Sequence, residues 1–498
     1  MAIDNELWRI PVSDRPSHGS LWATAAFVLV FNLGILSTFL GLVALYPLRW
    51  TRLNAWYMKL GKRTFGRLLV LVSQACVPMR FVVTRGPGVS PDWVVWDETR
   101  TQVERLNLPD EAVWIANHQT LADWFFLWQF LYQSTHSASL FIALKSSLRA
   151  IPVIGQACGW FGFAFLDRKW SKDEAPFGTQ LDKMADAATQ GRDASVSRDK
   201  DKEGNLSFLL FPEGTIVTDN TRGISTKFAK KTGVTDFEYT LLPRSTGLFF
   251  ALRRLASQVP SLSLIDLTVG YPLPSRSTGD APLYPSQFYT LPSIFLKQVP
   301  PEKLHVHVRC WKVAEIPLGD LGLERGELGE GTEHEKKEFE EWLMVRWKEK
   351  DELLREFNET GQFPSLATDG KDHLRENGRA EEDDDDGREP RDNELQVEWD
   401  VRLREPFVVE LSKTFGFGVP FLLGWYVLGS VTPYLIHAVA TGFRLARSAL
   451  VDRHPGDFDV TQAVEGTVDM CGCGKKGVEL VSDAIGEAVV RATGRTEL

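Results

Sequence analysis

The chain has 498 residues, which is enough for a large core and for one or two domains. Its formal net charge of −10 argues against a nucleic-acid-binding protein. Its five cysteines are an odd and widely scattered set, so they predict no disulfide framework and indicate reducing surroundings.

The first apolar segment, residues 21–48, has no charged side chain and is long enough to cross a bilayer, which takes about 20 residues. A buried helix of a soluble protein is the alternative. More basic residues follow the segment than precede it, so the positive-inside rule places the next part of the chain in the cytosol. We therefore expect residues 1–64 to comprise a tail, a transmembrane helix and a basic flank.

A second apolar stretch, residues 68–79, is too short to cross a membrane. Because Arg67 and Arg80 stand at its ends, it can lie in the membrane interface or enter the membrane and return. A core element beneath the domain that follows is an equal alternative.

Residues 65–317 have the pattern of a globular α/β domain. Helical stretches at 124–133, 181–190 and 247–255 lie between short apolar runs that are rich in β-formers. Strands that alternate with helices predict a twisted mixed sheet flanked by helices. The predicted strands are 81–84, 112–116, 140–144, 163–166, 206–211, 262–269 and 305–311.

The rest of the chain divides into a helical extension, an acidic linker and a second apolar segment. Residues 318–360 contain a long amphipathic helix candidate, and the acidic region 361–400 predicts a disordered linker. Within 401–450, the uncharged run 415–443 predicts a C-terminal transmembrane segment, with a re-entrant hairpin as the alternative. Basic residues on both sides leave its orientation open. The tail, 451–498, holds a short amphipathic helix candidate.

A histidine and an aspartate stand five residues apart directly after the predicted strand 112–116. Positions five apart lie about 140° apart on a regular helix, so the two side chains cannot share a helix face. They meet only if His118 lies in the turn before a helix and Asp123 lies in its first turns. Asp123 would then fix the tautomer of His118 and leave its other nitrogen free as a general base. An unrelated helix-start aspartate is the plain alternative.

Three further stretches end predicted strands with proline, glycine or arginine. Residues 162–168 end in Arg168, residues 208–215 run into Pro212, Glu213, Gly214 and Thr215, and residues 241–247 contain Pro243 and Arg244. An open α/β sheet binds its ligand at the ends of its strands, and arginine is suited to phosphate. Because the His118 motif has no serine or cysteine nucleophile, the substrate must bring its own hydroxyl or thiol.

The order of these four blocks resembles the glycerolipid acyltransferases of the PlsC type, the lysophosphatidic acid acyltransferase family. The blocks are Asn-His-x4-Asp, Gly-x-x-Phe-x-Asp-Arg, Phe-Pro-Glu-Gly-Thr and Leu-Pro-Arg, and they cover about residues 81–317. Residues 237–247 and 342–351 resemble one branch of the family. That branch includes the endoplasmic-reticulum lysophosphatidylinositol, lysocardiolipin and lysophosphatidic acid acyltransferases.

The resemblance implies the glycerolipid acyltransferase fold and transfer of an acyl group from acyl-CoA to a lysophospholipid at the endoplasmic reticulum membrane. It makes His118 the base that deprotonates a glycerol hydroxyl, with Asp123 behind it. Glu213, Gly214, Thr215 and Arg168 would hold the phosphate. Further cleft residues would be Asn117, Lys145, Pro212, Pro243 and Arg244. No metal or cofactor is expected, acyl-CoA is a co-substrate, and the partners are the lysophospholipid and the bilayer.

The sequence departs from the family pattern at Ile216, where many members have arginine after Glu-Gly-Thr. The departure removes one possible phosphate contact and favours an acceptor with a larger head group. Lysophosphatidylinositol is the first expected acceptor and lysophosphatidic acid the second. A phospholipid-dependent transacylase is a variant of the same reaction. A catalytically silent lipid-binding membrane protein is the alternative from another class.

Overall fold

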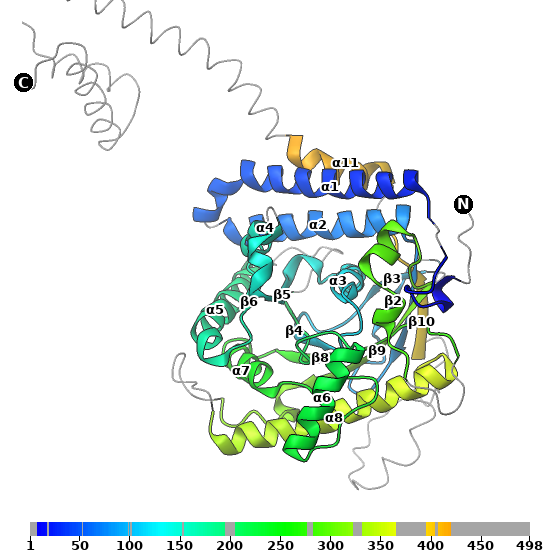
Figure 1. Cartoon of the computed structure of the whole chain (residues 1–498). Coiled ribbons are helices and arrows are strands. Elements are labelled where there is room, and N and C mark those ends of the chain that lie inside the picture. The colour runs from blue at the N-terminus through cyan, green and yellow to red at the C-terminus, as the bar shows by residue number, and fades with distance from the viewer. Residues whose placement is uncertain are drawn as a thin grey trace, which may run out of the picture. The chain divides into compact units, whose positions relative to one another are not determined.

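The computed structural model describes residues 7–16, 19–51, 53–97, 99, 102–151, 154–194, 205–275, 282–321, 331–364, 395–403 and 407–419. These residues form an α/β fold around an eight-stranded mixed sheet with the order β10-β1-β9-β8-β4-β7-β5-β6 (Figure 1). The strands are β1 (Arg80–Arg85), β4 (Glu111–Ala116), β5 (Leu140–Lys145), β6 (Ala164–Leu166), β7 (Leu206–Leu210), β8 (Ser263–Gly270), β9 (Lys303–Lys312) and β10 (Gln396–Asp400). A separate hairpin pairs β2 (Val94–Trp96) with β3 (Val103–Leu106).

The middle of the sheet is parallel. β4 pairs in parallel with β7 and β8, and β5 pairs in parallel with β7 and β6. Every residue of β4 and of β8 is buried, as expected for strands that are covered on both faces. Because the five strands run in one direction, the loops that follow β4, β5, β6 and β7 leave the sheet at one edge.

Helices cover both faces of the sheet (Figure 1). Along β4, Trp114 faces a core shared with α2 (Asn54–Cys76) and α3 (Asp123–Gln133). Its neighbours Val113 and Ile115 face the opposite core, since successive side chains of a strand alternate between faces. The helices of that second core are α5 (Trp170–Ala194), α7 (Ser245–Ala256) and α8 (Glu333–Thr360). The short α4 (Ile154–Trp160) and α6 (Asp219–Thr232) complete the domain.

The apolar stretch 68–79 is a core element, which supports the second of the two alternatives given above. It forms the end of α2 and the turn after it, and Leu68, Leu69, Val72 and Met79 are buried in the first core. The interfacial alternative is therefore wrong for these side chains.

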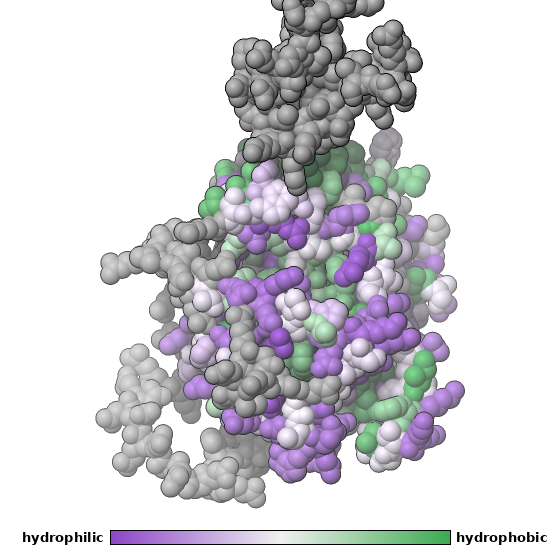
Figure 2. Space-filling model, turned by 90° about the vertical axis from the view of Figure 1, so that its left-hand side faces the viewer, coloured by the Kyte–Doolittle hydropathy of each residue, from purple (hydrophilic) through white to green (hydrophobic). Residues whose placement is uncertain are grey.

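The first apolar segment forms α1 (Leu21–Ala44), which packs along α2. The backbones approach closely, since a Cβ atom on Gly34 would stand 2.2 Å from Leu68. Among the described residues, α1 is the one helix that is long and apolar enough to cross a membrane. Apolar side chains lie among polar ones in the upper part of the face shown in Figure 2, and along α1 much of the outer surface is apolar and exposed. These exposed residues are Leu21, Trp22, Val28, Leu29, Leu33 and Leu36.

Two predictions from the sequence need correction. Residues 396–400 were assigned to the linker, but they form β10, which pairs antiparallel with β1. Val397 and Trp399 are buried while Glu398 is exposed, and that alternation is typical of a strand. Residues 241–243 were expected to extend as a strand, but they lie in a loop.

The linker residues 365–394 and the amphipathic tail lie outside the described residues, as does the predicted C-terminal transmembrane segment beyond Val419. The segment immediately before it forms α11 (Phe407–Phe415), which contacts α1 and α2.

Candidate active site

The catalytic candidate His118 lies just beyond the carboxyl end of β4. The preceding residue, Asn117, is fully buried, and its side-chain amide pairs with the backbone of Val269 in β8 through two hydrogen bonds of 2.9 and 2.8 Å. This pairing ties the end of β4 to β8. Asn117 therefore positions the loop, and His118 projects beyond the edge of the sheet.

His118 and Asp123 meet as predicted. His118 Nδ1 lies 2.8 Å from Asp123 Oδ2, and Asp123 is the first residue of α3. Because an ionised carboxylate only accepts hydrogen bonds, Nδ1 carries the proton and Nε2 has a free lone pair. Within the described residues Nε2 has no hydrogen-bond partner, and the His118 side chain is 19% exposed. A substrate hydroxyl can therefore reach it.

Asp123 is held by a cage of donors. Its fully buried carboxylate accepts the backbone N–H groups of Gln119 (2.7 Å) and Thr120 (3.1 Å) and the Thr120 hydroxyl (2.9 Å). The Tyr271 hydroxyl donates to the same carboxylate. Burial and the nearby charge of Asp123 raise the pKa of Tyr271 well above its ordinary value, so this hydroxyl stays a donor. These bonds fix the position of the carboxylate behind His118.

Phe211 fixes the plane of the catalytic ring. It follows β7, and its ring stacks on the His118 imidazole with centroids 4.3 Å apart and planes at 23°. His118 is thus oriented by a carboxylate at its Nδ1 atom and by an aromatic ring on its face.

Glu213 has a position that differs from the one expected. Its carboxylate is buried and accepts the backbone N–H of His118 (3.2 Å) and of Leu241 (3.1 Å). Burial raises the pKa of Glu213 to about 8. A buried carboxyl whose two oxygens are committed to backbone N–H groups is poorly placed to hold a phosphate. Glu213 instead joins the His118 loop to the loop that contains Leu241.

Arg168 and Arg244 form the basic side of the site. Arg168 follows β6 with a φ of 64°, a left-handed conformation that is costly for a side chain other than glycine. Burial and then the positive charge of Arg244 lower the pKa of Arg168, so the two side chains are close enough for their charges to interact. Neither has an ion-pair partner in the part of the chain that is described. Two neighbouring cations without a carboxylate are suited to a phosphate.

Gly214 and Pro212 bring the basic side next to the histidine. The Arg244 N–H donates to the Pro212 carbonyl at 2.9 Å. Gly214 has a φ of 70°, and a Cβ atom there would stand 3.5 Å from Arg244 Nε. The backbone at Gly214 therefore lies against the Arg244 side chain, one residue from Glu213.

Lys145 is exposed at the end of β5 on the same sheet edge, and Thr215 and Pro243 are half-buried. Among the described residues, no group of three or more His, Cys, Asp or Glu side chains is placed to hold a metal ion.

Comparison with known proteins assigns the family. The Acyltransferase family model matches residues 99–271, and the Acyltransferase C-terminus model matches residues 294–382. The 2-acyl-1-lysophosphatidylinositol acyltransferase of Saccharomyces cerevisiae is 31% identical over 323 residues, which are 61% of this chain and 76% of that protein. The chain belongs to the acyltransferase family.

Other relatives of this acyltransferase are similar at the same level. Lysocardiolipin acyltransferase 1 of Gallus gallus is 30% identical, over 55% of this chain and 67% of that protein. Lysophosphatidylinositol acyltransferase 10 of Caenorhabditis elegans is 27% identical, over 54% of this chain and 60% of that protein. The resemblance to the lysophosphatidylinositol and lysocardiolipin branch is confirmed.

Sequence reasoning missed several residues that shape the site of the acyltransferase. Tyr271 directly follows β8, the strand beside β4, so its place at a neighbouring strand end was a usable signal. Phe211 was read as the end of a strand, and nothing in its sequence context points to the imidazole. Asp351, on α8, was quoted only as part of a resemblance, although it binds the loop that reaches Glu213.

Proposed function

We propose that this acyltransferase transfers a fatty acyl group from acyl-CoA to a free glycerol hydroxyl of a lysophospholipid. His118 Nε2 takes the proton of the hydroxyl, and the oxygen attacks the thioester carbonyl. The tetrahedral intermediate collapses, the C–S bond breaks, and the CoA thiolate leaves and takes up a proton. The Asp123 carboxylate stabilises the imidazolium that forms between these steps. No covalent enzyme intermediate is needed, because the acceptor supplies the nucleophile.

The observation that carries the proposal is a His118 whose Nε2 is free, at the same edge of the sheet as Arg168 and Arg244. The charges of Arg168 and Arg244 interact, and the backbone of Gly214 lies against the Arg244 side chain, one residue from Glu213, which binds the His118 backbone. A lysophospholipid carries its phosphate and its free hydroxyl on the same glycerol backbone. One molecule can therefore place its phosphate at the arginines and its hydroxyl at the base. A catalytically silent lipid-binding protein has no need for an oriented base.

We propose lysophosphatidylinositol as the leading acceptor. Two of the relatives described above bear that acceptor in their names. The Ile216 side chain stands where many family members have an arginine, so one phosphate contact is replaced by hydrocarbon. Lysophosphatidic acid is the second candidate, supported by a relative from Arabidopsis thaliana named as a probable 1-acyl-sn-glycerol-3-phosphate acyltransferase.

The site works at a membrane surface. We propose that α1 lies in the endoplasmic reticulum membrane and that the catalytic domain faces the cytosol, as the basic flank of α1 favours. Both substrates carry acyl chains, and each CH₂ group moved through water costs about 0.8 kcal/mol. A membrane-held domain can take both substrates without that cost.

The test is an acceptor panel with the purified full-length protein. Radiolabelled oleoyl-CoA is offered with lysophosphatidylinositol, lysophosphatidic acid or lysophosphatidylcholine, and each acceptor is also tested with phospholipid as donor and no CoA ester. The proposal predicts acyl-CoA-dependent product that is largest with lysophosphatidylinositol. Transfer from phospholipid alone would contradict the proposal that acyl-CoA is the acyl donor. No transfer to any acceptor would contradict the proposed function as a whole.

Arg168→Ala tests phosphate binding separately from the acyl-transfer step. We expect the KM for the lysophospholipid to rise about tenfold, with a smaller change in the KM for acyl-CoA, because a charge-assisted phosphate contact is lost. Lys172→Ala, at an exposed position on α5, is the matched control and keeps both KM values. An equal rise in both KM values would contradict a phosphate role for Arg168.

A further inference from the structure

We propose that Asp351, on the C-terminal helix α8, is a positioning residue for the transfer reaction. It holds the loop of residues 236–241, and that loop in turn holds the backbone of His118. The inference rests on the proposed role of His118 as the base. It adds a function to α8, which lies in the part matched by the separate C-terminal family model, residues 294–382.

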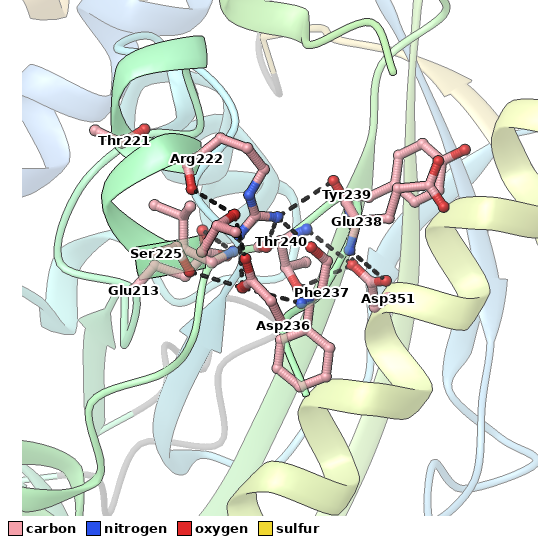
Figure 3. A network of polar contacts seen from close by, with 12 residues as sticks. Glu213, Thr221, Arg222, Ser225, Asp236, Phe237, Glu238, Tyr239, Thr240 and Asp351 are labelled. Atoms are coloured by element: carbon pink, nitrogen blue, oxygen red, sulfur yellow. Dashed lines mark hydrogen bonds and ion pairs between the residues drawn. The ribbon is translucent and has the colours of Figure 1, made fainter. Parts of the chain in front are cut away.

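Asp351 binds the loop backbone directly (Figure 3). Its carboxylate accepts the backbone N–H groups of Glu238 (3.0 Å), Tyr239 (2.7 Å) and Thr240 (2.9 Å). It also accepts the Thr240 hydroxyl at 3.1 Å. Three consecutive N–H groups on one buried carboxylate replace the ladder that a strand would have given this segment. The aspartate therefore sets the path of the loop backbone.

Arg222, on α6, holds the same loop from its other side. Its guanidinium donates to the carbonyl oxygens of Phe237, Glu238 and Thr240, and it pairs with Asp236. Figure 3 shows the loop between α6 and α8, with Arg222 and Asp351 pointing toward it from opposite sides. Three carbonyl groups of the loop thus face Arg222, and three N–H groups face Asp351. The loop backbone is therefore held from two sides.

Two contacts carry the loop position to the catalytic residue. The Leu241 N–H donates to Glu213 Oε2 at 3.1 Å, and Glu213 Oε1 accepts the His118 N–H at 3.2 Å. In parallel, the Gln119 side chain donates to the Tyr239 carbonyl at 3.0 Å. The side chain of Gln119 is therefore tied to Tyr239, which Asp351 holds, and the backbone of His118 is tied through Glu213 to Leu241, the residue that directly follows the three that Asp351 holds. A shift of the loop moves the catalytic histidine with it.

The expected consequence is a loss in kcat rather than in substrate affinity. Asp351 is buried and reaches the site only through the loop. Arg168 stands on another loop, and Arg244, at the end of the same α6–α7 connection, is anchored separately by its backbone N–H to the Pro212 carbonyl at 2.9 Å. A misplacement of a catalytic group by about 1 Å can cost about 100-fold in rate. Asp351→Asn keeps the size of the side chain and turns an NH₂ group toward a backbone N–H, so it loosens the loop without leaving a cavity.

The test compares kinetics of the full-length acyltransferase. We expect Asp351→Asn to lower kcat by about 10- to 100-fold and to change both KM values by less than about threefold. Glu352→Gln, the exposed neighbour on α8, is the matched control with wild-type kinetics. An unchanged kcat in Asp351→Asn, or a rise in KM at constant kcat, would overturn the inference.

A double-mutant cycle separates positioning from general stability. Asp351→Asn and Glu213→Gln act on one chain of contacts, so their effects on kcat will be less than additive. Additive losses would overturn the inference. If Asp351→Asn does not fold, Arg222→Lys loosens the same loop from its other side and will show the same kcat-only loss. If neither variant folds, Asp351 contributes to stability alone and the positioning role is rejected.

The wild-type protein and His118→Ala keep this test distinct from that of the proposed function. An inactive wild type rejects the function. An active wild type, an inactive His118→Ala and a normal Asp351→Asn reject the positioning role alone.

Discussion

At the scale of the residue, the site depends on buried groups that orient exposed ones. His118 is the reacting side chain, but its geometry comes from Asp123, Phe211 and Glu213, all of which contact it directly. Asp123 binds the ring, Phe211 covers one face of the ring, and Glu213 binds the backbone. A base that is held in this way need not reorganise when a substrate binds, which favours catalysis.

Glu213 gives a prediction for the pH dependence of stability. Its pKa is about 8 in the folded protein against 4.5 for the free side chain, because burial disfavours the charge. The folded state therefore keeps this proton while the unfolded state loses it. Stability falls as pH rises from about 4.5 to about 8, by about 1.4 kcal/mol for each unit between the two pKa values. We expect Glu213→Gln to weaken this dependence.

The measurement is the melting temperature of detergent-solubilised protein between pH 5 and 8. The wild type should lose stability across this range more steeply than Glu213→Gln. Glu340→Gln, at an exposed position on α8, is the control and should follow the wild type. Equal slopes for wild type and Glu213→Gln would show that the carboxyl is charged throughout the range.

At the scale of the element, α8 is fastened to the sheet by buried charges. Lys350 is fully buried and donates to Asp266 and to the Leu267 carbonyl of β8 (2.7 Å). Arg309, on β9, binds Asp266 at 2.6 Å and Glu349 of α8 at 2.6 Å. This network holds the helix that bears Asp351, so the sheet and the 236–241 loop have a common support.

Removal of one partner in this network should be costly. We expect Lys350→Met to lower the free energy of unfolding by about 3 kcal/mol, since Asp266 then stays buried with one cation instead of two. Thermal or denaturant unfolding of the purified protein measures the change. Lys348→Met, at an exposed position two residues earlier on α8, is the control. Equal stability of Lys350→Met and wild type would mean that the network contributes no net stability.

The sequence predicted the elements whose signal is local. The apolar strands next to His118 and the stripe of Phe339, Leu343 and Trp347 on α8 were visible as periodic patterns. Lys350 and Asp351 lie three and four residues after Trp347, so their place on the buried face could have been seen. The helix α6 was missed because its sequence, DNTRGISTKFAKKT, has few apolar residues.

Long-range contacts could not be predicted in the same way. β10 pairs with β1 more than 300 residues earlier in the chain, and a strand of five residues that follows an acidic region carries no mark of that partner. The role of Glu213 is similar, because it depends on which backbone N–H groups the fold brings to it. The meeting of His118 and Asp123 was predictable because turn geometry over five residues allows few solutions.

At the scale of the whole molecule, the exposed apolar surface of α1 requires an apolar environment. Leu29 is 60% exposed and Trp22 is 87% exposed, and contiguous apolar patches of this kind mark a contact with membrane or protein. The helix has 24 residues, which gives a length of about 36 Å at 1.5 Å per residue, close to the thickness of a bilayer core. We therefore place this surface in lipid.

Cysteine labelling tests that placement. In intact membranes, we expect Leu29→Cys to react far more slowly with a bulky water-soluble maleimide than Glu340→Cys, which is exposed on α8. The reaction of the native cysteines in the wild type is subtracted. Equal labelling of the two positions would place the outer face of α1 in water.

The central claim is that His118 activates the hydroxyl of a lysophospholipid. Its most direct test is the rate of oleoyl transfer from oleoyl-CoA to lysophosphatidylinositol by purified wild type and by His118→Ala, with equal melting temperatures as proof of folding. The account predicts that the wild type forms phosphatidylinositol and that His118→Ala reduces kcat by about 100- to 10,000-fold, since the general base is removed. A His118→Ala variant that transfers acyl groups at the wild-type rate would contradict it.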